Sequence, residues 1–220
     1  MTFGKLSPKK ESEICLSCGE CCKRYWITTL PEESKKISKK LKKKTAEFLK
    51  EDCVLLVKLY PKSVKGVLTF PTAFFPKRVV EELKKEIPEL PQSFFVIPQV
   101  VLRREGTEQK ACAFLLSDNK CDIYSARPEP CKLFPFIAVE GLRENYPFCG
   151  LFKSTYKDLL KQSRNYFKKV KKYFDLVDKK GFSSVWKDPP KTGYLYLNET
   201  KLCEITIDEL ERMVSAKKRK

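Results

Sequence analysis

The sequence of 220 residues contains no histidine. This excludes catalytic pairs of serine or cysteine with histidine, and it excludes any metal site built on imidazole. No two of the eight glycines are spaced G-x-G, so the usual nucleotide-binding turn of a Rossmann-like methyltransferase is missing. The cysteines include no C-x3-C-x2-C series of the radical-SAM type. A metal site in this chain has to be built from sulfur, carboxylate or water.

Long apolar runs are also missing. The longest runs, VLLV at 54–57 and FFVI at 94–97, are strand-sized and far from the ~20 apolar residues that cross a bilayer. Residues 1–15 lack the apolar segment of a signal peptide. We therefore expect a cytoplasmic protein with no membrane partner.

Cysteine, by contrast, is abundant, with ten residues in the chain. Disulfides are uncommon in a reducing compartment, so clustered cysteines point first to metal and second to redox chemistry. The densest cluster is CLSCGECC, which contains Cys15, Cys18, Cys21 and Cys22. A two-residue gap lets two thiolates turn toward one metal, and Gly19 permits the tight turn that such a loop requires. Three thiols in this series resemble the start of a ferredoxin-type run.

The adjacent pair in this cluster leaves two arrangements open. Neighbouring side chains usually point in different directions, so Cys21 and Cys22 either serve two metal centres or form an unusual corner of one. A second group of cysteines follows about ninety residues later, at Cys112, Cys121, Cys131 and Cys149. The eight thiols amount to two four-coordinate sites, or to one site with thiols to spare.

Sulfur-only ligation selects zinc or an iron–sulfur cluster. We favour a 4Fe-4S cluster, with zinc as the alternative, because zinc sites usually use two separated C-x2-C pairs. The remaining cysteines, Cys53 and Cys203, lie beside apolar runs and are predicted to be small buried core residues.

The same residues resemble the YkgJ-type CxxCxxCC cysteine-cluster family, which is described as zinc- or iron-chelating and whose signature the flagellin lysine-N-methylases share. The resemblance covers about residues 12–150. It departs from the family at Lys132, where arginine is usual. It implies metal chelation by the eight clustered cysteines and, at family level, a protein- or RNA-modification reaction such as methyl transfer. The matching residues are Cys15, Cys18, Gly19, Cys21, Cys22, Cys112, Phe114, Leu115, Cys121, Ile123, Tyr124, Arg127, Pro128, Cys131, Lys132, Phe134, Pro135 and the pair Cys149–Gly150.

Other residues near the cysteines have secondary roles. Arg127 is predicted either to anchor a turn or to place a cation beside the cofactor's thiolates, and we favour the second role. The carboxylates Glu20, Asp118 and Asp122 are weak acid–base candidates, because solvated carboxylates are common on any surface. The aromatic side chains of Tyr124, Phe134 and Phe136 are predicted to shield the centre from water.

The net charge of +17 comes mostly from lysine, since only nine of the 45 basic residues are arginine. Specific readers of nucleic acid favour arginine, so a heavily solvated surface of thermophile type is one interpretation. The rival function is a structural zinc module that binds RNA or a protein partner through lysine-rich faces. The charge alone does not assign a function, and the oligomeric state is not indicated.

The patterns predict an α+β, helix-rich single domain over 1–220 with small antiparallel hairpins and an irregular cysteine-rich metal-binding core. Its motif-bearing part is 12–150, followed by a C-terminal helical extension over 151–220. Apolar spacing predicts helices over about 31–50, 77–86 and 155–181, and a short final helix begun by the capping box of Thr206 and Glu209. The predicted extended segments are a strand at 54–59, a hairpin of 94–104 with 109–116, and a terminal hairpin at 194–205.

Overall fold

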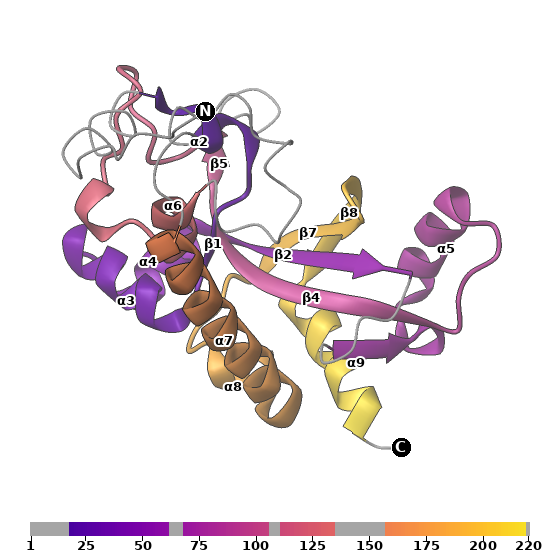
Figure 1. Cartoon of the computed structure of the whole chain (residues 1–220). Coiled ribbons are helices and arrows are strands. Elements are labelled where there is room, and N and C mark those ends of the chain that lie inside the picture. The colour runs from indigo at the N-terminus through magenta and orange to yellow at the C-terminus, as the bar shows by residue number, and fades with distance from the viewer. Residues whose placement is uncertain (1–17, 62–67, 106–110, 135–156, 219–220) are drawn as a thin grey trace. The chain divides into compact units, whose positions relative to one another are not determined.

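The computed structural model describes residues 18–61, 68–105, 111–134 and 157–218 (Figure 1). Helices and strands alternate along these segments, which confirms the predicted α+β class. The chain forms two compact units, one of Met1–Lys43 with Leu102–Lys169 and one of Lys44–Val101 with Val170–Lys220. The predicted boundary at residue 150 lies outside the described residues, so the single-domain organisation stays a prediction.

A mixed sheet forms the centre of the unit of Lys44–Val101 and Val170–Lys220. Strand β2 (Cys53–Tyr60) lies between β4 (Ser93–Leu102) and β7 (Thr192–Leu197), and β8 (Thr200–Thr206) continues the sheet beyond β7 (Figure 1). Strand β3 (Leu68–Pro71) pairs with β4 in antiparallel fashion. Since β2 is almost entirely buried, its apolar run VLLV is what a central strand requires.

The pairing of β2 with β7 is parallel and joins distant parts of the sequence. Leu55 lies opposite Gly193. A Cβ atom at Gly193 would lie 1.7 Å from the carbonyl oxygen of Leu55, so only glycine fits this close approach of two backbones. The predicted strand at 54–59 and the terminal hairpin of β7 and β8 are both confirmed.

Four shorter helical elements complete this unit: α4 (Thr45–Glu51), the 3-10 turn η1 (Thr72–Phe74), α5 (Lys77–Glu86) and α8 (Phe182–Val185). Helix α9 (Ile207–Lys218) ends the chain, and its predicted capping box is present. The Glu209 amide donates to Thr206 Oγ1 at 3.2 Å, and the Thr206 amide donates to Glu209 Oε2 at 2.9 Å. Helix α5 begins and ends where the sequence predicts.

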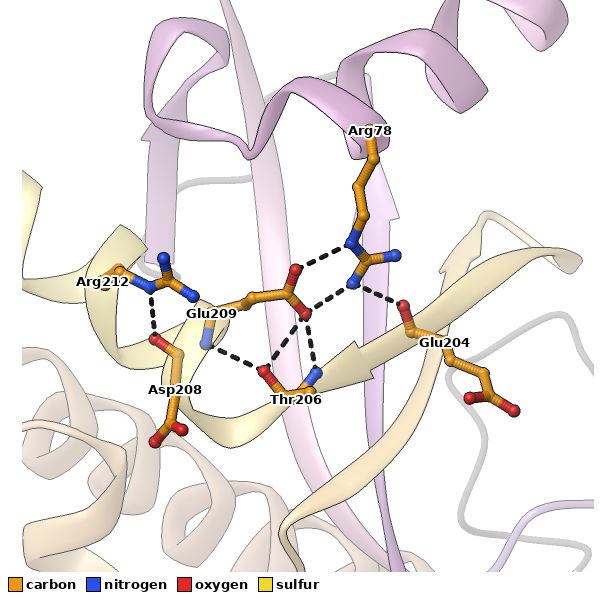
Figure 2. A network of polar contacts seen from close by, with 6 residues as sticks. All are labelled: Arg78, Glu204, Thr206, Asp208, Glu209 and Arg212. Atoms are coloured by element: carbon orange, nitrogen blue, oxygen red, sulfur yellow. Dashed lines mark hydrogen bonds and ion pairs between the residues drawn. The ribbon is translucent and has the colours of Figure 1, made fainter.

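Arg78 ties α5 to β8 and to α9 (Figure 2). Its Nε donates to Glu209 Oε1 at 2.8 Å, and its Nη2 donates to Glu209 Oε2 at 2.5 Å and to the Glu204 carbonyl at 3.0 Å. Burial raises the pKa of the Cys203 thiol, and the guanidinium of Arg78 opposes the shift. Cys203 is half-buried rather than fully buried as predicted, whereas Cys53 is buried as predicted.

The other unit holds short elements. They are α2 (Glu20–Arg24), β1 (Thr28–Thr29), α3 (Pro31–Lys40), β5 (Arg104–Glu105), β6 (Ala111–Cys112), the 3-10 turn η3 (Tyr124–Ala126) and α6 (Glu129–Leu133). Helix α7 (Lys157–Lys180) begins in this unit and passes the unit boundary at Lys169. It confirms the predicted long amphipathic helix. Phe167, which was predicted to lie on its apolar stripe, is however 42% exposed. None of the described helices is long and apolar enough to cross a membrane.

Two predicted elements are wrong in extent. The helix predicted over 31–50 is interrupted after Lys40, where Lys42 has a φ of 56° and the Lys43 amide donates to the Ser38 carbonyl at 2.9 Å. This is a Schellman-type helix end, and the chain enters its second unit directly after it. The predicted hairpin of 94–104 with 109–116 is confined to β5 and β6, because β4 pairs within the large sheet instead.

Candidate metal centre

Helix α2 carries the adjacent cysteines. Gly19 precedes it with a φ of 66°, a left-handed conformation that glycine adopts without strain, as the predicted turn requires. The site of a missing Cβ on Gly19 lies 3.1 Å from Leu115 Cδ1 and 3.2 Å from Asn119 Oδ1. The N-terminal cysteine block therefore packs against the turn that precedes Cys121.

The second cysteine block is folded by short-range bonds. Strand β6 contains Cys112, which is 7% exposed, and Leu115 forms an isolated bridge with Cys121. The 3-10 turn η3 follows, and then α6 begins after Pro128 and carries Cys131. Irregular structure was predicted over 117–150. Within 117–134 the chain forms turns, η3 and the short helix α6, and the remainder lies outside the described residues.

Cys21 and Cys22 lie on the same short helix and interact with each other. The neighbouring Cys22 thiol is the main cause that raises the pKa of Cys21 far above its ordinary value, and burial raises it further. Whether the pair serves one metal centre or two stays a prediction.

Four thiols from different elements lie in one neighbourhood. Burial is the main cause that raises the pKa of Cys131 well above its ordinary value, and the thiols of Cys21, Cys112 and Cys121 raise it further. Burial raises the pKa of Cys112 to about 11, with Cys121 and Cys21 adding to the shift. Burial likewise raises the pKa of Cys121, and Cys21 contributes. Each of these thiols would therefore be repelled as an anion by the others.

Of the remaining predicted ligands apart from Cys22, the structure describes only Cys18. Cys18 directly precedes Gly19 and is half-buried, while Cys15 and Cys149 lie outside the described residues. In the described part of the chain, no three cysteine, aspartate or glutamate side chains are close enough together to hold a metal ion. The described thiols of the two cysteine blocks nevertheless lie in one compact unit, whereas Cys53 and Cys203 belong to the other unit.

The residues fit a thiophilic metal on the chemistry of their donors. Metal ligation deprotonates cysteine, and a cation among four thiolates of one unit would replace their mutual repulsion with attraction. Arg127 supplies part of this compensation, since its guanidinium lowers the pKa of both Cys121 and Cys131 against the larger effect of burial.

Residues 14–150 match the model of the CxxCxxCC family, which carries the description "putative zinc- or iron-chelating domain". The chain belongs to this family. No curated protein and no solved structure matches the chain. Membership in the CxxCxxCC family supports metal binding, and the family description leaves zinc and iron as the two candidates.

Arg127 lies in the family's second block, next to the thiols as predicted. Its guanidinium carbon lies 3.7 Å from the centre of the Tyr124 ring, and its Nε donates to the Tyr124 carbonyl at 3.2 Å. Its contacts with Tyr124 hold the turn, and its positive charge lowers the pKa of Cys121 and Cys131 against the effect of burial. Its direct contact with a cofactor stays a prediction.

Of the predicted aromatic shield, Phe134 packs against Tyr25 with ring centres 5.6 Å apart, and Phe136 lies outside the described residues. The weak acid–base candidates are surface residues. Glu20 pairs with Lys23 and Arg24 on its own helix, and Asp118 pairs with Lys120. Asp122 is exposed.

Sequence reasoning missed Arg104 in the CxxCxxCC unit. From β5 it donates to the carbonyls of Tyr25 at 2.6 Å and Lys23 at 2.7 Å, and it makes a longer contact of 3.5 Å with the Cys22 carbonyl. Its guanidinium also lies over the Trp26 ring at 5.5 Å. These bonds cap the end of the helix that carries Cys21 and Cys22. No spacing signal marks this arginine in the sequence.

Glu33 was also missed. It is 7% exposed, and its carboxylate accepts the amide of Leu30 at 2.8 Å and the amide of Glu129 at 2.6 Å. Burial raises the pKa of Glu33, although both amide bonds oppose the shift. The residue joins the start of α3 to the start of the helix that carries Cys131.

Proposed function

We propose that this chain is a cytoplasmic metal-binding protein whose clustered cysteines hold a 4Fe-4S cluster in preference to zinc. The observation that supports this most is the mutual effect of Cys21, Cys112, Cys121 and Cys131 on one another's pKa. Cys15, Cys18, Cys22 and Cys149 complete the proposed donor set. A reducing compartment suits the proposal, because it keeps clustered thiols available as ligands.

The chain's own residues have defined tasks in this proposal. Arg104 fixes the carbonyls that end α2 and so orients the thiols of Cys21 and Cys22. Arg127 offsets part of the negative charge at Cys121 and Cys131. The rings of Tyr25 and Phe134, which directly follow α2 and α6, pack against each other and would limit the access of water to the thiols on these helices. A bound iron–sulfur cluster would supply electron transfer, or an open iron for a protein- or RNA-modification reaction such as methyl transfer.

The test is purification without oxygen, followed by analysis of metal and acid-labile sulfide and by an absorption spectrum. The proposal predicts iron and sulfide in equal amounts with broad visible absorption that bleaches on reduction. Stoichiometric zinc with no visible absorption would identify the alternative metal. The full chain without either metal would contradict the proposal as a whole.

The second candidate is a structural zinc module that binds RNA or a protein through lysine-rich faces. Exposed lysines support it, with Lys35, Lys36, Lys39 and Lys40 on α3 and Lys168, Lys171 and Lys172 on α7. Nucleic-acid affinity that falls steeply with salt would favour this function, because each neutralised phosphate releases counterions. A nucleic-acid affinity that does not change with salt concentration would contradict this function.

A further inference from the structure

A pocket lies beside the segment that joins Cys121 to Cys131. Its volume is about 310 Å³, at the lower end of the range of small-molecule sites. Its lining comes from the start of helix α3, from the segment between Ser125 and Lys132, and from Lys169. All of these residues belong to the unit of Met1–Lys43 and Leu102–Lys169.

Two of the three carboxylates in the pocket wall already have partners within the protein. The buried carboxylate of Glu33 accepts two backbone amides, from Leu30 and from Glu129. The carboxylate of Glu129 is paired with the Lys169 ammonium. Glu32 is the third carboxylate. The acidic side chains of this wall thus serve mainly to hold α3, α6 and α7 together.

Three cations in the wall remain available. Arg127 is held by its ring contact with Tyr124 and by its Nε bond to the Tyr124 carbonyl. In the described residues nothing accepts a hydrogen bond from its two terminal amino nitrogens. Lys36 and Lys132 are exposed in the wall and form no ion pair with any described residue. With Lys169 and Glu129 paired, the three cations exceed the carboxylates of Glu32 and Glu33 by one positive charge.

A fixed guanidinium fork beside two ammonium groups is the arrangement that recognises a phosphate dianion. The volume exceeds what a phosphate group fills, so there is room for an organic part. We propose that this pocket binds the phosphate group of a small organic phosphate ester, through Arg127, Lys36 and Lys132. The proposal does not depend on which metal, if any, the cysteines hold.

Two other sources of oxyanions are less suited to this pocket. A monocarboxylate presents only two oxygens, whereas a terminal phosphate presents three that can meet the guanidinium and both ammonium groups. A nucleic-acid backbone presents phosphates along a convex rod, and a concave pocket of this size admits a terminal phosphate better than an internal one. Both become arms of the test.

The experiment is calorimetric titration of the full chain with adenosine monophosphate, inorganic phosphate, acetate and a short single-stranded RNA that lacks terminal phosphates. We expect the monophosphate to bind and acetate not to bind. Lys36→Met should weaken monophosphate binding roughly fivefold or more, since a hydrogen bond to a charged group is lost. Lys39→Met removes the same charge from an exposed position of the same helix outside the pocket and should leave binding unchanged.

Lys132→Met is the second variant and should weaken binding to a similar degree. Circular dichroism and metal content of each variant confirm that the fold is intact. Absence of monophosphate binding, equal effects of Lys36→Met and Lys39→Met, or equal affinity for acetate would each overturn the proposal. Binding of the RNA but not the monophosphate, with loss in Lys36→Met, would overturn it in favour of a nucleic-acid backbone.

Discussion

The adjacent thiols of Cys21 and Cys22 interact, and this interaction bears on the number of metal centres. The sequence left open whether they feed two centres, because the direction of a side chain depends on local backbone geometry. In the structure a helix of five residues carries both, and Cys22 is the main cause that raises the pKa of Cys21. We therefore expect the pair to serve one site.

A prediction follows for this pair. Cys21→Ser and Cys22→Ser should each abolish the same metal complement, because one cooperative centre needs its thiolates in fixed geometry. The measurement is metal per chain by mass spectrometry, together with sulfide if iron is present. If Cys22→Ser lost about half of the metal and Cys21→Ser lost the other half, the pair would serve two centres and the contact would be incidental.

Cys53 tests the opposite expectation. It is 1% exposed and belongs to the sheet of the other unit, so Cys53→Ala should retain full metal. Removal of the buried thiol should lower the free energy of unfolding by about 1 kcal/mol. Urea denaturation and metal analysis of the same sample measure both. Loss of metal in this variant would show that the ligand set is wrong.

The candidate thiol donors could be found from the sequence, because their spacing identifies them without knowledge of the fold. The roles of Arg104 and Glu33 could not be predicted from the sequence. They act through backbone carbonyls and amides that are brought together only by folding: Arg104 reaches residues about eighty positions away, and Glu33 reaches the amide of Glu129. Such contacts leave no local signature.

At the level of elements, Arg104 on β5 orients α2. Arg104→Met should weaken metal affinity roughly 10- to 100-fold, the usual cost of losing a group that orients ligands. Competition with a chelator of known affinity measures this, and the visible spectrum reports any change in ligation. Arg164→Met removes the same charge from an exposed position on α7 and serves as the control. Equal affinities for the two variants would contradict the positioning role.

The Arg78–Glu209 pair predicts a pH dependence of stability (Figure 2). Burial alone would raise the pKa of Glu209, but the hydrogen bonds from Arg78 and Thr206 outweigh it and lower the pKa from its ordinary value of 4.5. A lowered carboxyl pKa stabilises the fold above that ordinary value, and the stabilisation is lost as pH falls through the folded-state pKa.

Arg78→Met should therefore lower the free energy of unfolding by about 1 kcal/mol at neutral pH, with Arg78 half-exposed. The difference from wild type should shrink as the solution is acidified to about pH 3. Urea denaturation across this range is the measurement. Among the described residues Arg212 bonds only the Asp208 carbonyl, at 3.3 Å, so Arg212→Met should show no such trend. A difference for Arg78→Met that stays constant with pH would refute the linkage.

Elements with complete local signals were predicted to the residue. Helix α5 follows Pro76 and stops before Pro88, with Val79 and Leu83 buried as one stripe. The parallel pairing of β2 with β7 could not be predicted, because its partners are remote and Gly193 reveals its role only beside Leu55. The interruption of the helix after Lys40 was not predicted, because the lysine run continues the helical sequence pattern through the turn.

For the whole molecule, the structure divides the cysteines between two units. The six described thiols of the family signature lie in the unit of Met1–Lys43 and Leu102–Lys169, and Cys53 and Cys203 lie in the other. Family membership over residues 14–150 supports metal binding, yet that range also includes the segment from Lys44 to Val101. The proposed metal ligands therefore come from two separated stretches of the family region.

The central claim is that these separated stretches hold one metal centre. The most direct test is metal per chain in the full-length protein purified without oxygen, compared between wild type, Cys131→Ser and Cys53→Ala. Cys131 is chosen because its pKa responds to thiols of both blocks. We predict stoichiometric metal in wild type and Cys53→Ala and its loss in Cys131→Ser. Wild type without metal, or Cys131→Ser with its full complement, would contradict the claim.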